Sequence, residues 1–236
     1  MLVIGLLIML STSTYARKGS IETPWETLFN GKDFKGWKVL NDENNVRIED
    51  SCFVCHPVAN TKLSTFLCTE KTFGDFIFEV DAKIDGGLHT NFLLRSKEVK
   101  MDSSKANVSG YQVKIDPTVR RWTGGIFDGG KSGIEWYYPL TGREEAQSAF
   151  KINEWNHYRM EAIGDSIKVW VNGIPTSNLV HDKYSNGGIG IKIHSIGNFP
   201  EMEKMLMRFK NMKIITKNPA KFKKSLDYPV INLKEK

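Results

Sequence analysis

The chain has 236 residues and a formal net charge of +6, which suits one large domain or two small ones. The positive charge lies at the two ends of the sequence, whereas a nucleic-acid-binding protein concentrates it on a folded face. Residues 217–236 have a net charge of +4 and Arg17 and Lys18 supply the rest, so residues 19–216 are neutral. We therefore expect a basic C-terminal tail over 217–236, part of which can pack on the domain, and no nucleic-acid partner.

The N-terminal segment has the features of a secretory signal. Leu2 to Leu10 form an uncharged apolar run, and small and polar residues lead from it to Ala16. Such a run is too short to span a bilayer but matches the apolar part of a signal peptide. We expect cleavage after Ala16 and a secreted or periplasmic protein, with a buried N-terminal strand as the alternative. No later segment is apolar over a length that predicts a membrane span.

The stretch "CFVCH" at 52–56 matches C-x-x-C-H, the motif that attaches a c-type haem. Its surroundings alternate between polar and apolar residues, which predicts a strand on which Cys52 and Cys55 point to opposite faces. Both thiols of a haem motif must reach one porphyrin edge, so the pattern does not favour haem. A zinc site is not favoured either, because a second pair of ligands at metal-site spacing is absent from the sequence.

The three cysteines allow one disulfide at most. If 52–57 and 63–69 form a hairpin, a register that pairs Pro57 with Leu63 also pairs Cys52 with Cys68, at a distance suitable for a bridge. In that register Cys55 faces Thr65. We predict Cys52–Cys68 as the one plausible bridge, although a slip of one residue would leave three free thiols.

The body of the chain alternates with period two, the signature of half-buried strands. The clearest examples are 76–83, 111–116, 167–172 and 189–194, and Asn172-Gly173 is a tight-turn signal. The best helix candidate is short, at about 142–149. Many short strands with regular turns predict an all-β fold, a sandwich or jelly roll in a single domain.

Polar side chains on the outward faces of these strands are the candidate site. Gln112, Lys114 and Asp116 share one strand face and Lys192 and His194 share another, while Asn91 and Arg95 lie on a third strand. If the strands are neighbours, these groups converge. Other roles remain open: a local hydrogen bond for His194, a turn cap for Asp116 and a structural ion pair for Arg95. Trp122 either presents a ring to a sugar or packs in the core, and Glu79 either joins the face or lies at a solvated edge.

An ordered series of motifs resembles the 3-keto-disaccharide hydrolase domain family. "TLFNGKDFKGWKV" (27–39) resembles the opening of that family, and "GYQVKIDPTVRRWTGGIFD" (110–128) is the most specific block. The remaining blocks are "IEDSCFVCHP" (48–57), "GDFIFEVDAKI" (74–84), "HTNFLLRS" (89–96), "EWNHYRMEAIGDSIKVWVNGIP" (154–175), "GGIGIKIHS" (187–195) and "RFKNMKI" (208–214). The resemblance covers about 25–216, which we take as the domain.

This resemblance implies a concanavalin A-like jelly-roll sandwich of two curved antiparallel sheets with a sugar groove. It also implies a carbohydrate substrate, a glycoside whose sugar is oxidised to a ketone at C3. The acidic C2 proton is removed, the glycosidic oxygen leaves by elimination, and water adds. Such chemistry needs a base and a group that stabilises the enolate oxygen. Some members are thought to use a divalent metal for the second task.

In this scheme we expect His194 or Asp116 to transfer protons, with Arg95, Lys114 and Gln112 holding substrate oxygens; Lys192, Trp122, Asn91 and Glu79 complete the candidate set. Lys114 and Lys192 replace an acid and an amide of the family pattern, and His89 and Asn91 also depart from it. The two lysines disfavour a metal and favour an anionic substrate or enolate. The alternative function is a non-catalytic, lectin-like carbohydrate-binding module.

Overall fold

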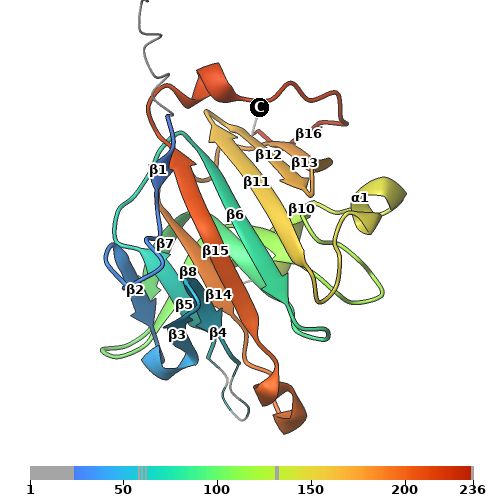
Figure 1. The fold of residues 1–236 in the computed structure, drawn as a ribbon. Helices are drawn as coiled ribbons and strands as arrows, with labels where there is room; N and C mark the ends of the chain where they lie inside the picture. Colours follow the sequence, from blue (N-terminus) through green and yellow to red (C-terminus); the bar gives the residue numbers. More distant parts are fainter. Residues whose placement is uncertain (1–23, 58, 60, 62, 131–132, 235–236) are drawn as a thin grey trace, which may run out of the picture.

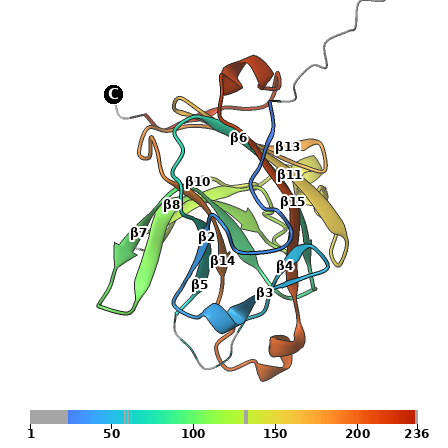
Figure 2. The ribbon, with the colours of Figure 1, turned by 60° about the vertical axis from the view of Figure 1, so that its left-hand side comes forward.

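The computed structural model describes residues 24–234 except 58, 60, 62 and 131–132, and it consists mainly of two sheets packed face to face (Figures 1 and 2). The predicted signal peptide, 1–16, lies outside the described residues. The helix expected at 142–149 is present as α1 (Glu144–Ser148). The described residues also include three short 3₁₀ helices: η1 (Glu43–Asn45), η2 (Pro200–Lys204) and η3 (Pro219–Phe222).

In the described part of the chain, the larger sheet has nine strands. In spatial order they are β16 (Ile231–Asn232), β13 (Ile174–Val180), β12 (Ser166–Val171), β11 (Trp155–Ile163), β6 (Phe76–Ile84), β15 (Met207–Ile215), β4 (Cys52–Cys55) and β3 (Val46–Glu49), with β1 (Glu26–Thr27) paired to β15. All described pairings of this sheet are antiparallel except that of β13 with β16.

The second sheet has seven described strands, all antiparallel to their neighbours. In spatial order they are β10 (Gly133–Tyr138), β9 (Ile126–Gly130), β8 (Ala106–Ile115), β7 (Thr90–Lys100), β14 (Gly188–Ile193), β5 (Thr65–Thr69) and β2 (Trp37–Leu40). Strands β7 and β8 are consecutive in the sequence, β14 comes from a distant part of it, and together they form the centre of this sheet.

The core lies between the sheets because every second residue of each strand is apolar and points inward. From the nine-stranded sheet, Phe78 and Tyr158 meet Phe92 of the seven-stranded sheet, with ring centroids 6.2 and 5.1 Å from it. The outward residues of the same strands are therefore the ones available for function. The strands and the turn at Asn172-Gly173 are as predicted, and both turn residues have positive φ, 50° and 83°.

The strand over "CFVC" is confirmed as β4, with Cys55 in the core and Cys52 on the other face. The hairpin predicted to follow it is wrong. Strand β4 pairs with β3 and β15, whereas β5, which carries Cys68, lies in the opposite sheet between β14 and β2. Cys55 consequently lies beside Val46 and Met207, not Thr65, and all three thiols are free. Every residue of β4 and β5 is buried, so alternation did not specify the pairing partner.

The basic C-terminal segment packs on the nine-stranded sheet over much of its length. Strand β16 extends that sheet, the Asn178 side chain donates to the carbonyl of Tyr228 at 2.8 Å, and the Arg159 side chain donates to the carbonyl of Phe222 at 2.7 Å. Tyr228 and Ile231 pack against the core and help to anchor this segment, while its described lysines stay exposed. Among the described residues, no helix has the length and apolarity needed to cross a membrane.

Candidate functional site

The centre of the seven-stranded sheet brings together three of the predicted side chains in one row. In the register of strands β8, β7 and β14, Lys114 lies opposite Asn91, and Asn91 lies opposite Lys192. The residues on either side of each, such as Val113 and Ile191, point into the core, so the row faces outward. Neighbouring strands are about 4.8 Å apart, which separates the two lysine backbones by about 10 Å. The three strands that carry these residues are therefore neighbours in one sheet, as the convergence expected from the sequence requires.

Asn91 is the centre of a chain of hydrogen bonds that runs from Gln112 on β8 to His194, which follows β14. The Asn91 amide nitrogen donates to Oε1 of Gln112 at 3.1 Å and lies 2.9 Å from Nε2 of His194. Asn91 is fully buried, and its Oδ1 atom has no hydrogen-bond partner among the described residues. Gln112 packs so closely on Gly129 that a side chain at that glycine would collide with it. Gln112 therefore holds Asn91, and Asn91 holds the His194 ring at Nε2. The other ring nitrogen, Nδ1, is left available to a ligand.

The two ammonium groups of the row are largely buried, and neither forms an ion pair with a described residue. Burial lowers the pKa of Lys114 to about 8; nearby Asp116 opposes this effect and Arg120 and Lys192 add to it. Burial also lowers the pKa of Lys192. Each ammonium lies 5.9 Å from the centre of an aromatic ring, Phe127 for Lys114 and Phe66 for Lys192. Rings at this distance attract a cation without neutralising it, so the row presents positive charge to an incoming group.

His194 lies at the end of the row, half-buried and close to a second imidazole. Its ring centroid is 4.6 Å from that of His89. Burial, reinforced by Lys192, Lys114 and His89, holds the pKa of His194 well below its usual range, so this imidazole is neutral at neutral pH. Burial and the nearby Lys114 likewise lower the pKa of His89. His89 was not among the predicted site residues, although its position two residues before Asn91 on an alternating segment was the available signal.

Asp116 lies beside the row, but its carboxylate is occupied. Arg120 donates to Oδ2 from Nε at 2.8 Å and from Nη2 at 2.7 Å, and the Thr118 hydroxyl donates to Oδ1 at 2.7 Å. Burial raises the pKa of Asp116, but the hydrogen bonds from Thr118 and Arg120 outweigh it and the pKa falls below its usual value. The predicted turn-cap role is thus present in the geometry, and Asp116 is a poor proton acceptor.

The side chain of Trp122 lies against Arg120, the residue that binds Asp116 beside the row. The guanidinium carbon of Arg120 lies 4.8 Å from the centre of the Trp122 ring and 5.1 Å from that of Trp136, and the two indoles meet edge to face. Arg120 therefore lies over the Trp122 ring, which the sequence suggested as a surface for a sugar to stack on. Arg120 follows Asp116 by four residues, and this spacing could have indicated their ion pair from the sequence.

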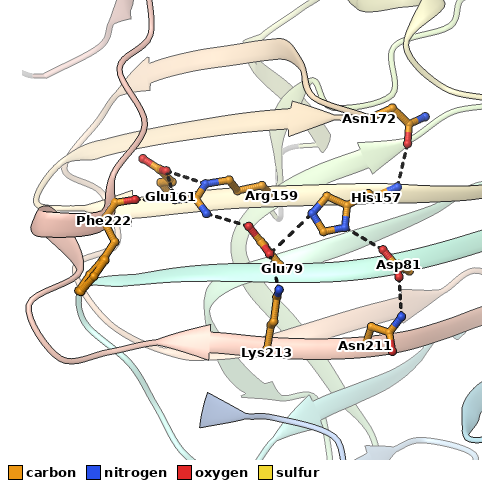
Figure 3. A network of polar contacts seen from close by, with 9 residues as sticks. All are labelled: Glu79, Asp81, His157, Arg159, Glu161, Asn172, Asn211, Lys213 and Phe222. Carbon is orange, nitrogen blue, oxygen red and sulfur yellow. Dashed lines mark hydrogen bonds and ion pairs between the residues drawn. The ribbon is translucent and has the colours of Figure 1, made fainter. Parts of the chain in front are cut away.

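Two predicted residues lie elsewhere. Arg95 is 1% exposed and its guanidinium donates to the carbonyls of Gly74, Gly164 and Tyr184 and to Asp75, so it ties the two sheets together. Glu79 belongs to the nine-stranded sheet, where it contacts Arg159, Lys213 and His157 (Figure 3). Neither side chain reaches the row of Lys114, Asn91 and Lys192.

The residues of the row do not fit a divalent metal. Among the described residues, no group of three or more His, Cys, Asp or Glu side chains is arranged to hold a metal ion. The nearest carboxylate, Asp116, is bound to Arg120, and two ammonium groups flank the imidazoles. These ammonium groups would repel a metal cation, so we derive no step through a metal.

The family of this protein follows from its sequence as a whole. Residues 24–215 match the family described as 3-keto-alpha-glucoside-1,2-lyase-like domain. The chain belongs to this family. The match has nearly the bounds expected for the domain, and it includes all three strands of the row. None of the curated proteins compared matches the chain significantly.

Solved structures with similar folds include enzymes and binding modules for carbohydrates. A candidate glycosyl hydrolase from Parabacteroides distasonis is 18% identical, with a TM-score of 0.56, over 81% of this chain and 93% of that one. The β-glucanase of Bacillus licheniformis is 13% identical, with a TM-score of 0.53, over 82% and 97%. The carbohydrate-binding module CBM66 from Bacillus subtilis is 16% identical, with a TM-score of 0.51, over 76% and 95%. The fold is therefore the concanavalin A-like jelly roll that the resemblance to the family implied.

Proposed function

We propose that this protein cleaves glycosides whose sugar carries a ketone at C3, outside the cytoplasm as its N-terminal segment suggests. The observation that carries the proposal is a neutral imidazole, His194, fixed by Asn91 beside two ammonium groups that have no carboxylate partner in the described part of the chain. An imidazole can remove a proton next to a ketone, and unpaired ammonium groups can stabilise the enolate that results. Membership of the family supports the same substrate.

In the proposed reaction, Nδ1 of His194 takes the C2 proton and the electron pair moves to the C3 oxygen. Lys114 and Lys192 stabilise that oxyanion. The enolate then reforms the ketone and expels the oxygen at C1, which receives the proton from His194, and water adds to C1 of the unsaturated product. Nδ1 is the base in the tautomer that carries the proton on Nε2. This tautomer requires the amides of both Asn91 and Gln112 to turn, so that Oδ1 of Asn91 accepts from Nε2–H of His194 and from the Gln112 amide nitrogen.

An ordinary glycosidase mechanism has less support. It requires two carboxylates, an acid and a base or nucleophile, on either side of the glycosidic bond. The carboxylate beside the row is Asp116, and Arg120 and Thr118 occupy both of its oxygens. An elimination driven by the ketone needs no carboxylate, and two ammonium groups favour its anionic intermediate.

The test is to incubate the protein with a methyl 3-keto-glucoside and with its unoxidised parent, with and without a chelator, and to follow release of methanol. We expect release from the keto form only, unchanged by the chelator, and faster exchange of the C2 proton in D₂O. Release from the unoxidised parent alone would overturn the proposal. Binding of both sugars without release or exchange would support the lectin-like alternative.

A further inference from the structure

A cavity of about 380 Å³ lies at the end of the sandwich, next to His194. It is bounded by the residues that follow β14, by the segment before β7, and by η2 and the start of β15. Its apolar lining consists of Pro57, Leu88, Ile196, Phe199, Met202 and Met207. Cavities of this size accept small organic molecules.

Among the described residues, few polar groups line this cavity. The Ser195 hydroxyl already donates to the carbonyl of Thr61, which leaves the rings of His89 and His194. A second sugar would bring several hydroxyl groups that this lining cannot satisfy, whereas an aromatic ring would lose little by leaving water. Phe199 is 59% exposed, which places an apolar surface at the mouth. Methionine side chains adapt to aromatic groups of different shape.

The cavity and the row meet at one residue. His194 lines the cavity and also contacts Asn91 of the row. If the C3 oxygen lies at Lys114 and Lys192 and the C2 proton at His194, then C1, which is bonded to C2, lies beyond His194. The substituent at C1 therefore points from the row toward the cavity.

From this continuity we propose that the cavity binds the leaving group and that this group is an apolar, aromatic aglycone, not a second sugar. The inference rests on the proposed function, because it is the position of C2 at His194 that directs C1 to the cavity. It names the substrate class: 3-keto-glycosides of aromatic alcohols or phenols.

The experiment compares 3-keto-glucosides with benzyl and methyl groups at C1, whose leaving alcohols have similar acidity, and a 3-keto-disaccharide with a glucosyl group there. The leaving sugar is the more acidic alcohol, so a preference for benzyl reports binding and not leaving-group acidity. We expect kcat/KM for the benzyl substrate to exceed the other two at least tenfold. Phe199→Ala and Met202→Gln should reduce that preference several-fold by lowering kcat/KM for the benzyl substrate. Phe222→Ala, at a partly exposed phenylalanine of η3 beside the nine-stranded sheet, is the matched control.

Binding of benzyl alcohol, measured by ligand-observed NMR with the same variants, separates this inference from the proposed function. If no keto-glycoside reacts but benzyl alcohol binds and Phe199→Ala abolishes binding, the proposed reaction fails and the aromatic site stands. If the 3-keto-disaccharide reacts as well as the benzyl substrate and Phe199→Ala changes neither, the reaction stands and the aromatic site is overturned.

Discussion

The outward faces of the two sheets carry similar residues in different electrostatic arrangements. On the nine-stranded sheet, Glu79 is matched by Arg159 at 2.7 Å and Lys213 at 3.0 Å, and Asp81 is matched by His157 at 2.7 Å (Figure 3). On the seven-stranded sheet, Lys114 and Lys192 are buried with no carboxylate partner among the described residues. A network whose charges are satisfied supports the fold, whereas buried cations left unpaired reduce stability and are ready to bind an anion.

The histidines of the two faces show the same difference. His157 lies between Asp81 and Glu79, on the paired face. Burial, reinforced by Lys192 and Lys114, holds the pKa of His194 well below the usual range. The first imidazole is suited to bridge two carboxylates, and the second to remain neutral and accept a proton. Substitutions on the two faces should therefore separate stability from turnover.

The largest effect is expected from His194→Ala. Loss of a general base commonly lowers a rate by about 10²- to 10⁴-fold, so turnover of a methyl 3-keto-glucoside should fall within this range. The melting temperature should change little, because His194 faces the row and not the core. His157→Ala on the other sheet is the matched control and should leave turnover unchanged. Equal loss of activity in both variants would remove the distinction between the faces.

Lys114→Met should lower turnover by about 10²- to 10³-fold, the usual cost of losing one group that stabilises an oxyanion. Lys114 must be protonated for this role, and its pKa is lowered to about 8, so kcat/KM should fall as the pH rises through about 8. His194 must be neutral, and its pKa lies well below 6.5, so the acid limb should lie below pH 6.5.

Lys114→Arg sharpens this assignment, because arginine keeps its proton throughout the range. In that variant the alkaline limb of the pH profile should move upward, even if turnover is reduced. An alkaline limb that stays near pH 8 would show that another group titrates there, and Lys114 would lose its assigned role.

Arg159→Ala tests the paired face. Arg159 binds Glu79 and Glu161, and all three side chains are at most 10% exposed. Removing one partner of a buried ion pair leaves an uncompensated charge, so the free energy of unfolding should fall by about 3 kcal/mol. Turnover per folded molecule should not change. Arg47→Ala, which breaks an exposed pair with Glu49, should cost less than about 1 kcal/mol in the same denaturant titration.

The alternation of the sequence predicted which residues share a face, and this was sufficient for Lys114, Asn91 and Lys192. It could not predict Arg95, because a bulge follows Leu94 and Arg95 has a φ of 51°, which turns its side chain from the Asn91 face toward Gly164. For Glu79 the outward direction was correct but the sheet was not, since the order of strands depends on contacts distant in sequence. Asp116 was placed near the row, but its occupation by Arg120 depends on a turn whose shape the sequence does not specify.

The smallest effect concerns the three cysteines, which occupy three layers of the molecule. Cys52 lies on the outward side of β4, Cys55 in the core, and Cys68 on the outward face of the seven-stranded sheet in a cluster with Phe66 and Leu93. All three are buried, and burial raises the pKa of each thiol, to about 12 for Cys68 and least for Cys52. Because the thiolate is the reactive form, native protein should react slowly, with Cys52 modified first.

Iodoacetamide labelling followed by peptide mass spectrometry gives the order of modification, and denatured, unreduced protein should yield three free thiols with Ellman's reagent. A count of one free thiol would show that a disulfide is present. It would favour the hairpin between β4 and β5, and the strands would then be divided differently between the two sheets. Rapid modification of Cys68 in native protein would show that the cluster beside the row opens readily. In that case the seven-stranded face would be mobile where we describe a fixed arrangement, and the distances assigned to Lys192 and His194 would no longer define the site.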